Sequence, residues 1–334
     1  MNATRKVSAV LAATTLVVAL ASCSSSDAGG GDGGGEEGDA YSIALIPGVA
    51  NDAYYGSVAC GVQAVADENG ATVDVQAPNS FSPTDQIPIL QSVIATSPDA
   101  IIIAPTDSKA LYAPLREAVE AGITVVLVDT TLDDPSIAVS QVSSDNEEAG
   151  KVAAETLAEA LGDEAGSVIT VNLTAGVTTT DAREAGFAEA IAGVDGLEYL
   201  GQQYSNNSVQ TAESIVSAAI AANPDLVGVF STAAFNTEGA VAALKSADMQ
   251  DTVKVVGFNA NPPGIEQISN GDVFAQVVLK PYDEGVQAAE QAFNALNGDE
   301  VEEVITTGAL VATADNLDDP EIQKYLYSFD CPAS

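Results

Sequence analysis

The stretch Ile-Thr-Val-Val-Leu-Val-Asp-Thr-Thr, residues 123–131, is an unbroken β-branched and apolar run that stops abruptly at Asp129. A continuous run of this kind, rather than an alternating one, indicates a strand that is buried on both faces, as in a parallel sheet. Asp129 comes at the carboxyl end of that strand, which is the edge where open α/β sheets bind ligands. The stretch therefore predicts both the fold class and a first candidate site residue.

The same arrangement occurs a second time further along the chain. In the first half, a strand over residues 100–104 and a helix precede the strand that ends at Asp129. In the second half, a strand over residues 226–230 and a helix precede a strand over residues 253–258, which is followed by Asn259. Two similar halves, each with a polar side chain at a matching strand end, predict a ligand held between two lobes.

Strands and helices alternate along the rest of the chain. Such alternation means right-handed crossovers and parallel sheets, so the predicted fold is α/β with two Rossmann-like lobes joined by a multi-strand hinge. Further strands are expected over residues 41–47, 71–77, 137–142, 166–172, 197–204, 273–279 and 304–311. We expect lobe 1 to comprise residues 40–142 and 277–304, and lobe 2 to comprise residues 143–276 and 305–334.

Length and charge limit the classes of function. At 334 residues with 46% hydrophobic residues, the chain is long and apolar enough for two folded domains. It carries 48 acidic and 10 basic residues, a net charge of −38, which argues against nucleic acid as a partner because phosphates would be repelled. The chain has no His, which removes His-dependent nucleophilic catalysis and His-ligated zinc. We expect no metal and no cofactor.

Residues 1–22 read as a secretory signal peptide. A positive start precedes an apolar core over residues 7–19, which is shorter than the ~20 residues that span a bilayer. The core leads into Leu-Ala-Ser-Cys, which resembles the bacterial lipobox and predicts a lipidated Cys23. The alternative is ordinary cleavage near an Ala-x-Ala site. From Ser24 the chain is almost wholly Ser, Gly, Asp and Glu, so residues 23–39 are expected to be the lipid anchor and a flexible linker.

Several short motifs follow one another in a fixed order. They are Tyr54-Tyr55 ahead of Gly61, Val128-Asp129-Thr130, Ser144-Asp145-Asn146 with Gly150, Arg183-Glu-Ala-Gly186-Phe187, Gly257-Phe258-Asn259 and Ala275-Gln276. Over about residues 41–311, this order resembles the sugar-type periplasmic binding proteins of ABC transporters, the type I group that includes ribose- and galactose-binding proteins. Transcriptional repressors of sugar operons share the same core, but they carry a helix-turn-helix where this chain has a leader and a linker.

The resemblance implies which residues bind a ligand. Asp129 and Arg183 would hydrogen-bond ligand hydroxyls, which suits their chemistry because a carboxylate accepts and a guanidinium donates. The alternative for Asp129 is a cap of the following turn. The alternative for Arg183 is a surface pair with Asp181 or Glu184.

Aromatic and further polar residues would complete the site. Tyr54 and Tyr55 would offer a flat face to a sugar ring, unless one of them packs into the core. Asn51 and Asp52 lie in the loop after the first strand, where the alternative is an ordinary turn. Asn259 stands where the family usually has Asp. The set that the resemblance implies is Asn51, Asp52, Tyr54, Tyr55, Asp129, Thr130, Arg183, Phe235, Asn236, Asn259 and Gln276.

Two cysteines remain once Cys23 is lipidated. Outside the membrane such a pair is expected to oxidise, which favours a disulfide bond between Cys60 and Cys331 that ties the tail to the first helix. The alternative is a buried free Cys60 and a loose Cys331, because the sequence contains no distance between them.

These features together predict a lipid-anchored, monomeric, extracytoplasmic receptor that is not an enzyme. It would capture a small polar solute, a monosaccharide or related polyol, by closing two lobes about a hinge, and present it to an ABC permease. The alternative on the same fold is a sensor that reports an autoinducer-like signal or a polyol to a membrane kinase. A third possibility is a glycosidase, but the sequence shows no paired-acid motif.

Overall fold

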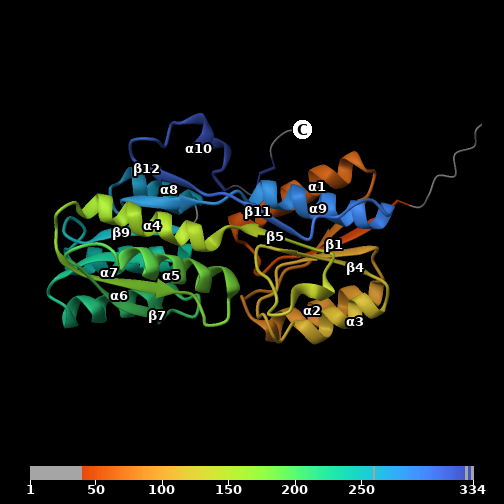
Figure 1. The fold of residues 1–334 in the computed structure, drawn as a ribbon, viewed down its shortest axis with the longest axis horizontal. Coiled ribbons are helices and arrows are strands. Elements are labelled where there is room, and N and C mark those ends of the chain that lie inside the picture. Colours follow the sequence, from red (N-terminus) through yellow and green to blue (C-terminus); the bar gives the residue numbers. More distant parts are fainter. Residues whose placement is uncertain (1–39, 259, 328–329, 332–334) are drawn as a thin grey trace, which may run out of the picture. The chain divides into compact units, whose positions relative to one another are not determined.

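The computed structural model describes residues 40–258, 260–327 and 330–331, and the structural statements below concern that part of the chain. It contains two six-stranded sheets, each covered by helices on both faces (Figure 1). The predicted leader, the linker with Cys23, and Asn259 lie outside the described residues. Within the described ranges, no helix is both long enough and apolar enough to cross a bilayer.

The first sheet forms the core of lobe 1. Its strand order is β11-β5-β4-β3-β1-β2 and all of its strand pairs are parallel. The strands are β1 (Ser42–Ile46), β2 (Thr72–Val75), β3 (Ala100–Ile103), β4 (Thr124–Val128), β5 (Ser140–Ser144) and β11 (Val304–Thr307). Helices α1 (Ala53–Glu68) and α9 (Pro281–Asn297) cover one face. Helices α2 (Pro83–Thr96) and α3 (Tyr112–Glu120) cover the other, and the 3-10 turn Pro135–Ile137 leads into β5.

The second sheet forms the core of lobe 2, in the order β12-β10-β9-β8-β6-β7. The strands are β6 (Gly166–Asn172), β7 (Leu197–Tyr204), β8 (Leu226–Ser231), β9 (Lys254–Phe258), β10 (Ala275–Val278) and β12 (Leu310–Thr313). Among the described strands of this sheet, only the β12–β10 pair is antiparallel. Helices α4 (Asn146–Leu161) and α5 (Thr178–Ile191) cover one face, and α6 (Val209–Ala222) and α7 (Ala234–Ala247) the other. Two short helices, α8 (Pro262–Ser269) and α10 (Pro320–Lys324), complete this half.

Strand β4 shows why the apolar runs are unbroken. Val126 and Val128 point into the cluster beneath α1 and α9, whereas Val125 and Leu127 point into the cluster beneath α2 and α3. Successive side chains of a strand face opposite sides, so a sheet with helices on both faces needs apolar residues at every position. The prediction of parallel, doubly covered sheets is confirmed.

The chain passes between the two sheets three times. It does so after β5, after β10, and at residues 308–309 between β11 and β12. The prediction of a single strand over residues 304–311 is therefore wrong, because β11 pairs with β5 in the first sheet whereas β12 pairs with β10 in the second. The same pairing places all of β10 in the second sheet and all of β11 in the first. Strand β5 likewise stays in the first sheet as far as Ser144. The changes of sheet thus fall a few residues later than the predicted positions 143, 277 and 305.

Two helix pairs, α1 with α9 and α4 with α5, pack closely through glycine. A Cβ atom added at Gly285 would overlap the backbone carbonyl of Val58, and one added at Gly150 would overlap the carbonyl of Arg183. Interiors are packed densely enough that neither backbone has room to yield by a methyl group without cost. The α4–α5 contact therefore fixes the position of the backbone that carries Arg183.

The tail after β12 connects both lobes. Tyr327 donates its backbone N–H to the carbonyl of Ala260 at 3.0 Å, and Ile322 is buried in the same apolar cluster. Cys331 forms a disulfide bond with Cys60 on α1, with 5.2 Å between the two Cα atoms. The tail thus packs on lobe 2 and is joined covalently to lobe 1.

Candidate ligand-binding site

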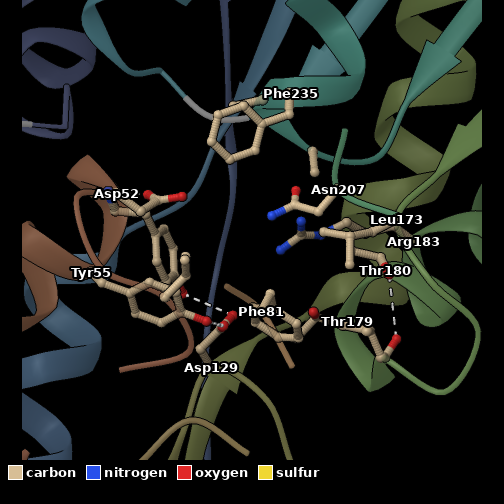
Figure 2. Close-up of a pocket in the computed structure, with 15 residues that line it drawn as sticks. Asp52, Tyr55, Phe81, Asp129, Leu173, Thr179, Thr180, Arg183, Asn207 and Phe235 are labelled. Carbon is tan, nitrogen blue, oxygen red and sulfur yellow. Dashed lines mark hydrogen bonds between the residues drawn. The ribbon is translucent and has the colours of Figure 1, made fainter. Parts of the chain in front are cut away.

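A cleft of about 530 Å³, including the part open to solvent, lies between the carboxyl ends of the strands of the two sheets (Figure 2). Lobe 1 contributes one wall, made of Val49, Asp52, Tyr54, Tyr55, Phe81 and Asp129. Lobe 2 contributes the other, made of Leu173, Val177, Thr179, Thr180, Arg183, Asn207, Ala233, Ala234 and Phe235. Both walls combine aromatic rings with a few polar groups, as ligand sites commonly do.

Asp129 is the centre of the lobe 1 wall. It follows β4 directly, and its φ of 62° lies in the left-handed region, which Asp tolerates better than most residues. Its Oδ2 accepts a hydrogen bond from the Tyr55 hydroxyl at 2.7 Å, and its Oδ1 accepts a longer one from the Tyr54 hydroxyl at 3.2 Å. These contacts hold the carboxylate towards the cleft, so it is not the cap of the following turn.

Burial raises the pKa of Asp129, while the Arg183 guanidinium and the hydroxyls of Tyr55 and Tyr54 act in the opposite direction. Two tyrosine donors occupy only part of the carboxylate, which has about four lone-pair positions. Asp129 therefore retains acceptor capacity for a hydroxyl group that enters the cleft.

Asp52 fixes the beginning of α1. Its side chain accepts a hydrogen bond from the backbone N–H of Tyr54 at 2.8 Å, which is the usual role of an N-cap residue. The cap orients the first turn, where the rings of Tyr54 and Tyr55 pack edge to face with 5.3 Å between their centroids. Both tyrosines are buried, and both line the cleft. Burial raises the pKa of Asp52, and the charge of Asp129 adds to that effect.

Glu284 supports this wall from behind, and the sequence analysis did not identify it. Its side chain is fully buried, and its Oε2 accepts a hydrogen bond from the Tyr54 hydroxyl at 2.6 Å. Burial, followed by the nearby charge of Asp129, raises the pKa of Glu284 from 4.5 to about 7. In the sequence it is one of two acids in the first turn of a helix that begins at Pro281, which is ordinary for a helix N-terminus. No local signal distinguishes it.

Arg183 is the only cation in the lobe 2 wall among the described residues. It is 4% exposed, its Nε donates to Asn146 Oδ1 at 2.8 Å, and its Nη1 donates to the carbonyl oxygen of Thr232 at 2.9 Å. The guanidinium carbon also lies 4.4 Å from the ring centroid of Phe258. Figure 2 shows the guanidinium pointing into the gap, opposite Asp129. Its Nη2 has no hydrogen-bond partner among the described residues, so it is available to a ligand.

The alternative pairing of Arg183 with a surface acid is not observed. Asp181 accepts from Gly176 N at 2.8 Å, and Glu184 accepts from the Tyr199 hydroxyl at 2.7 Å. Within the ranges that the structure describes, Arg183 has no ion pair with either acid.

The start of helix α5 brings further residues into the wall. The helix begins at Thr178, after the N-cap residue Val177. Thr179 and Thr180 therefore lie inside the first turn and line the cleft. The sequence analysis also missed Asn207, which lines the cleft. Its only signal in the sequence is a pair of adjacent asparagines after β7, and both have positive φ in the structure.

Four predicted contacts do not line this cleft. Asn51 is exposed in the turn before α1, and Thr130 donates its hydroxyl to a backbone carbonyl at 2.8 Å. Asn236 is fully buried and bonded within lobe 2, whereas Gln276 is buried with an Oε1 that has no hydrogen-bond partner among the residues that the structure describes. Their role as ligand contacts stays a prediction, as does that of Asn259. Phe235 lines the cleft as expected.

The described residues contain no group of three or more Cys, Asp, Glu or His side chains arranged to hold a metal ion.

Comparison with known proteins identifies the family of this chain. The model of the periplasmic binding protein domain family matches residues 43–300. The ribose import binding protein of Escherichia coli is 28% identical over 261 residues, which cover 78% of this chain and 86% of that protein. A D-ribose/D-allose-binding protein of Pseudomonas aeruginosa is 32% identical over 216 residues, or 62% of this chain and 66% of that protein.

Solved structures agree with these relatives. An ABC transporter solute-binding protein of Agrobacterium vitis with bound α-D-tagatopyranose superposes with a TM-score of 0.84 at 35% identity, covering 86% of this chain and 99% of that one. A second protein of that organism, with bound D-fucose, superposes with a TM-score of 0.81 at 29% identity, covering 86% of this chain and 100% of that one. The chain therefore belongs to the periplasmic binding protein family, and its relatives there are sugar import binding proteins of ABC transporters.

Proposed function

We propose that this protein captures a neutral monosaccharide or related polyol between its lobes and delivers it to an ABC permease. The observation that supports this most directly is the opposition of Asp129 on one wall and Arg183 on the other. A sugar hydroxyl both donates and accepts, so it satisfies a carboxylate and a guanidinium at the same time. The rings of Tyr54, Tyr55 and Phe235 provide apolar surface for the C–H faces of a sugar ring.

The charges of the cleft favour a neutral ligand over an acidic one. Asp52 and Asp129 face a single cation among the described lining residues, Arg183, and Glu284 adds a further carboxyl behind Tyr54. A uronic acid or sugar phosphate would bring its own negative charge next to these groups in a partly desolvated site, where like charges repel strongly. The relatives with bound tagatose and fucose are consistent with this preference.

Delivery would depend on closure of the two lobes about the three connections between the sheets. The protein would act outside the cytoplasm as a monomer, with residues 1–22 removed and Cys23 carrying a lipid anchor. It would release its ligand unchanged, because its relatives are binding proteins rather than enzymes.

A thermal-shift screen with monosaccharides, polyols and uronic acids tests the proposal. A bound ligand raises the melting temperature by mass action, so at least one neutral sugar should raise it while the matching uronic acid does not. Calorimetry should then give a Kd of about micromolar or tighter, and the sugar should be recovered unchanged after incubation. A screen in which no neutral sugar stabilises the protein would remove the proposal.

A further inference from the structure

Glu284 joins two of the three connections between the lobes. Its Oε1 accepts a hydrogen bond from Ser144 Oγ at 2.5 Å and another from Thr307 Oγ1 at 3.0 Å. Ser144 is the last residue of β5, and Thr307 is the last residue of β11. Both strands belong to the first sheet, and the chain passes to the second sheet directly after each of them. Glu284 thus lies where the lobes are connected, although it does not line the cleft.

The other oxygen of Glu284 reaches the ligand site through Tyr54. The Tyr54 hydroxyl has a single proton, and it lies 2.6 Å from Glu284 Oε2 but 3.2 Å from Asp129 Oδ1. One proton makes only one short, well-directed hydrogen bond, so the shorter distance assigns it to Glu284. Asp129 Oδ1 then keeps only the longer contact with Tyr54 and can accept a shorter hydrogen bond from a ligand hydroxyl, while Tyr55 donates to Oδ2.

We propose that Glu284 is a positioning residue for ligand binding, whose carboxylate draws the Tyr54 hydroxyl away from Asp129 and so makes affinity depend on the charge of Glu284. This inference rests on the proposed function, because it requires that a ligand hydroxyl donates to Asp129. Glu284 itself does not contact the ligand. It acts through Tyr54 on the first wall of the cleft.

Protonation of Glu284 would reverse the direction of this hydrogen bond. A proton taken from solvent would be placed on Oε2, because Oε1 already accepts from two hydroxyls. Glu284 would then donate to the Tyr54 oxygen, and the Tyr54 O–H would turn to Asp129 Oδ1. That oxygen would then already accept a charge-assisted hydrogen bond from Tyr54, so a ligand hydroxyl would compete with that bond for the same oxygen.

Among the described residues, the charge of Asp129 at the end of β4 disfavours the charged form of Glu284, whereas the hydrogen bond from Tyr54 on α1 favours it. Burial raises the pKa of Tyr327 in the tail, and the nearby charge of Glu284 contributes to that rise. On α9 itself, Asp283 is bonded to the Tyr325 hydroxyl at 3.0 Å. Since the pKa of Glu284 is raised to about 7, its charge changes near neutral pH.

The sign of the effect follows from linkage. If the ligand prefers the charged form of Glu284, affinity falls as the pH decreases from 8 to 6, and binding near pH 7 releases a proton. The two forms of Glu284 differ in the strength of the hydrogen bond that the ligand makes to the Asp129 carboxylate. We therefore expect the Kd of the wild type to rise by about fivefold to tenfold as the pH falls from 8 to 6.

Calorimetry at pH 6, 7 and 8 with D-tagatose and D-ribose as probes tests the proposal. Glu284→Gln keeps the shape of the side chain but cannot ionise, so its affinity should be independent of pH and close to that of the wild type at pH 6. Tyr54→Phe removes the hydroxyl that transmits the effect, so its profile should also be flat although Glu284 is intact. Glu290→Gln is the matched control, since Glu290 is exposed on the same helix, and it should retain the wild-type profile.

Two results would overturn the proposal: a flat profile for the wild type, or a pH-dependent profile in Glu284→Gln that matches that of the wild type. If neither probe nor any other sugar binds at any pH, the proposed function fails instead. Carbon-13 NMR of the glutamate carboxyl groups in the ligand-free protein then measures the pH at which Glu284 takes up a proton. A signal with a midpoint near pH 7 that is missing in Glu284→Gln supports the proposal, and a Glu284 that is fully charged at pH 6 contradicts it.

Discussion

The two walls of the cleft differ in the groups that they offer and in how those groups are held. The lobe 1 wall offers acceptors, Asp52 and Asp129, whose carboxylates are supported by a backbone N–H and by tyrosine hydroxyls. The lobe 2 wall offers donors, chiefly Arg183, which is held by an amide oxygen, a backbone carbonyl and an aromatic ring. Each lobe thus satisfies only part of its own polar groups. The remainder is left for a ligand that both donates and accepts.

The walls also differ in how burial affects the charges of their side chains. Burial raises the pKa values of Asp52, Asp129 and Glu284, so the lobe 1 wall holds several acids in an environment that disfavours their charges. Among the described residues, the lobe 2 wall holds one cation, Arg183, which donates to an amide oxygen and a backbone carbonyl. We infer that the first wall responds to pH while the second supplies a constant charge, and the following experiments separate the two.

The largest expected effect is on stability, through Glu284. Its pKa is raised in the folded state, so between pH 4.5 and 7 the folded protein binds more protons than the unfolded chain. The free energy of unfolding should therefore rise as the pH falls from 8 to 5, by on the order of 3 kcal/mol from this group. Urea unfolding at each pH measures it. Glu284→Gln should lose that part of the slope and Glu290→Gln should keep it; equal slopes in all three proteins would contradict the prediction.

Arg183→Ala removes the charge of the second wall. Loss of charge-assisted hydrogen bonds of about 1.5–3 kcal/mol each should weaken sugar binding by at least about tenfold. Calorimetry with the sugar identified in the thermal-shift screen measures the change. Arg116→Ala is the control, because Arg116 forms an exposed pair with Glu120 on lobe 1 and does not line the cleft. Unchanged affinity in Arg183→Ala would remove Arg183 from the site.

Gly186→Ala tests whether the α4–α5 contact positions the second wall. A Cβ there would overlap the carbonyl oxygen of Glu147, so the two helices must separate. Overpacking of this kind costs about 1–3 kcal/mol, and we expect both the free energy of unfolding and the sugar affinity to fall. Gly193→Ala serves as the control because Gly193, beyond the end of α5, has room for a methyl group. A variant that loses stability but keeps full affinity would show that the helix contact does not set the position of Arg183.

Asp129→Asn should have the smallest of these effects. The amide can still accept one hydrogen bond and tolerates positive φ, but it lacks the charge that strengthens a bond to a ligand hydroxyl. We expect a loss of affinity of about tenfold or somewhat less, below that of Arg183→Ala. Asp163→Asn, at an exposed position after α4, is the matched control. A larger loss than in Arg183→Ala would mean that the lobe 1 wall dominates binding.

Local patterns were sufficient wherever one element determined the outcome. The run before Asp129 predicted a doubly buried strand with a carboxylate at its end, because helices on both faces require apolar residues throughout. Local sequence patterns failed where pairing with distant segments of the chain decided the structure. Residues 304–311 look like one strand, and only pairing with β5 and β10 divides them between two sheets. Glu284 looks like an ordinary acid of a first helical turn until Ser144 and Thr307 meet it.

The sequence alone determined the α/β alternation, the division into two lobes, and the placing of Asp129 at the carboxyl end of its strand, because periodicity and chain order are local properties. Only the tertiary structure decided which side chains share the cleft and which support it from behind. That selection depends on contacts between segments more than a hundred residues apart, such as Tyr54 with Glu284. The pKa of a buried acid depends on the same contacts, since burial and neighbouring charges exist only in the folded chain.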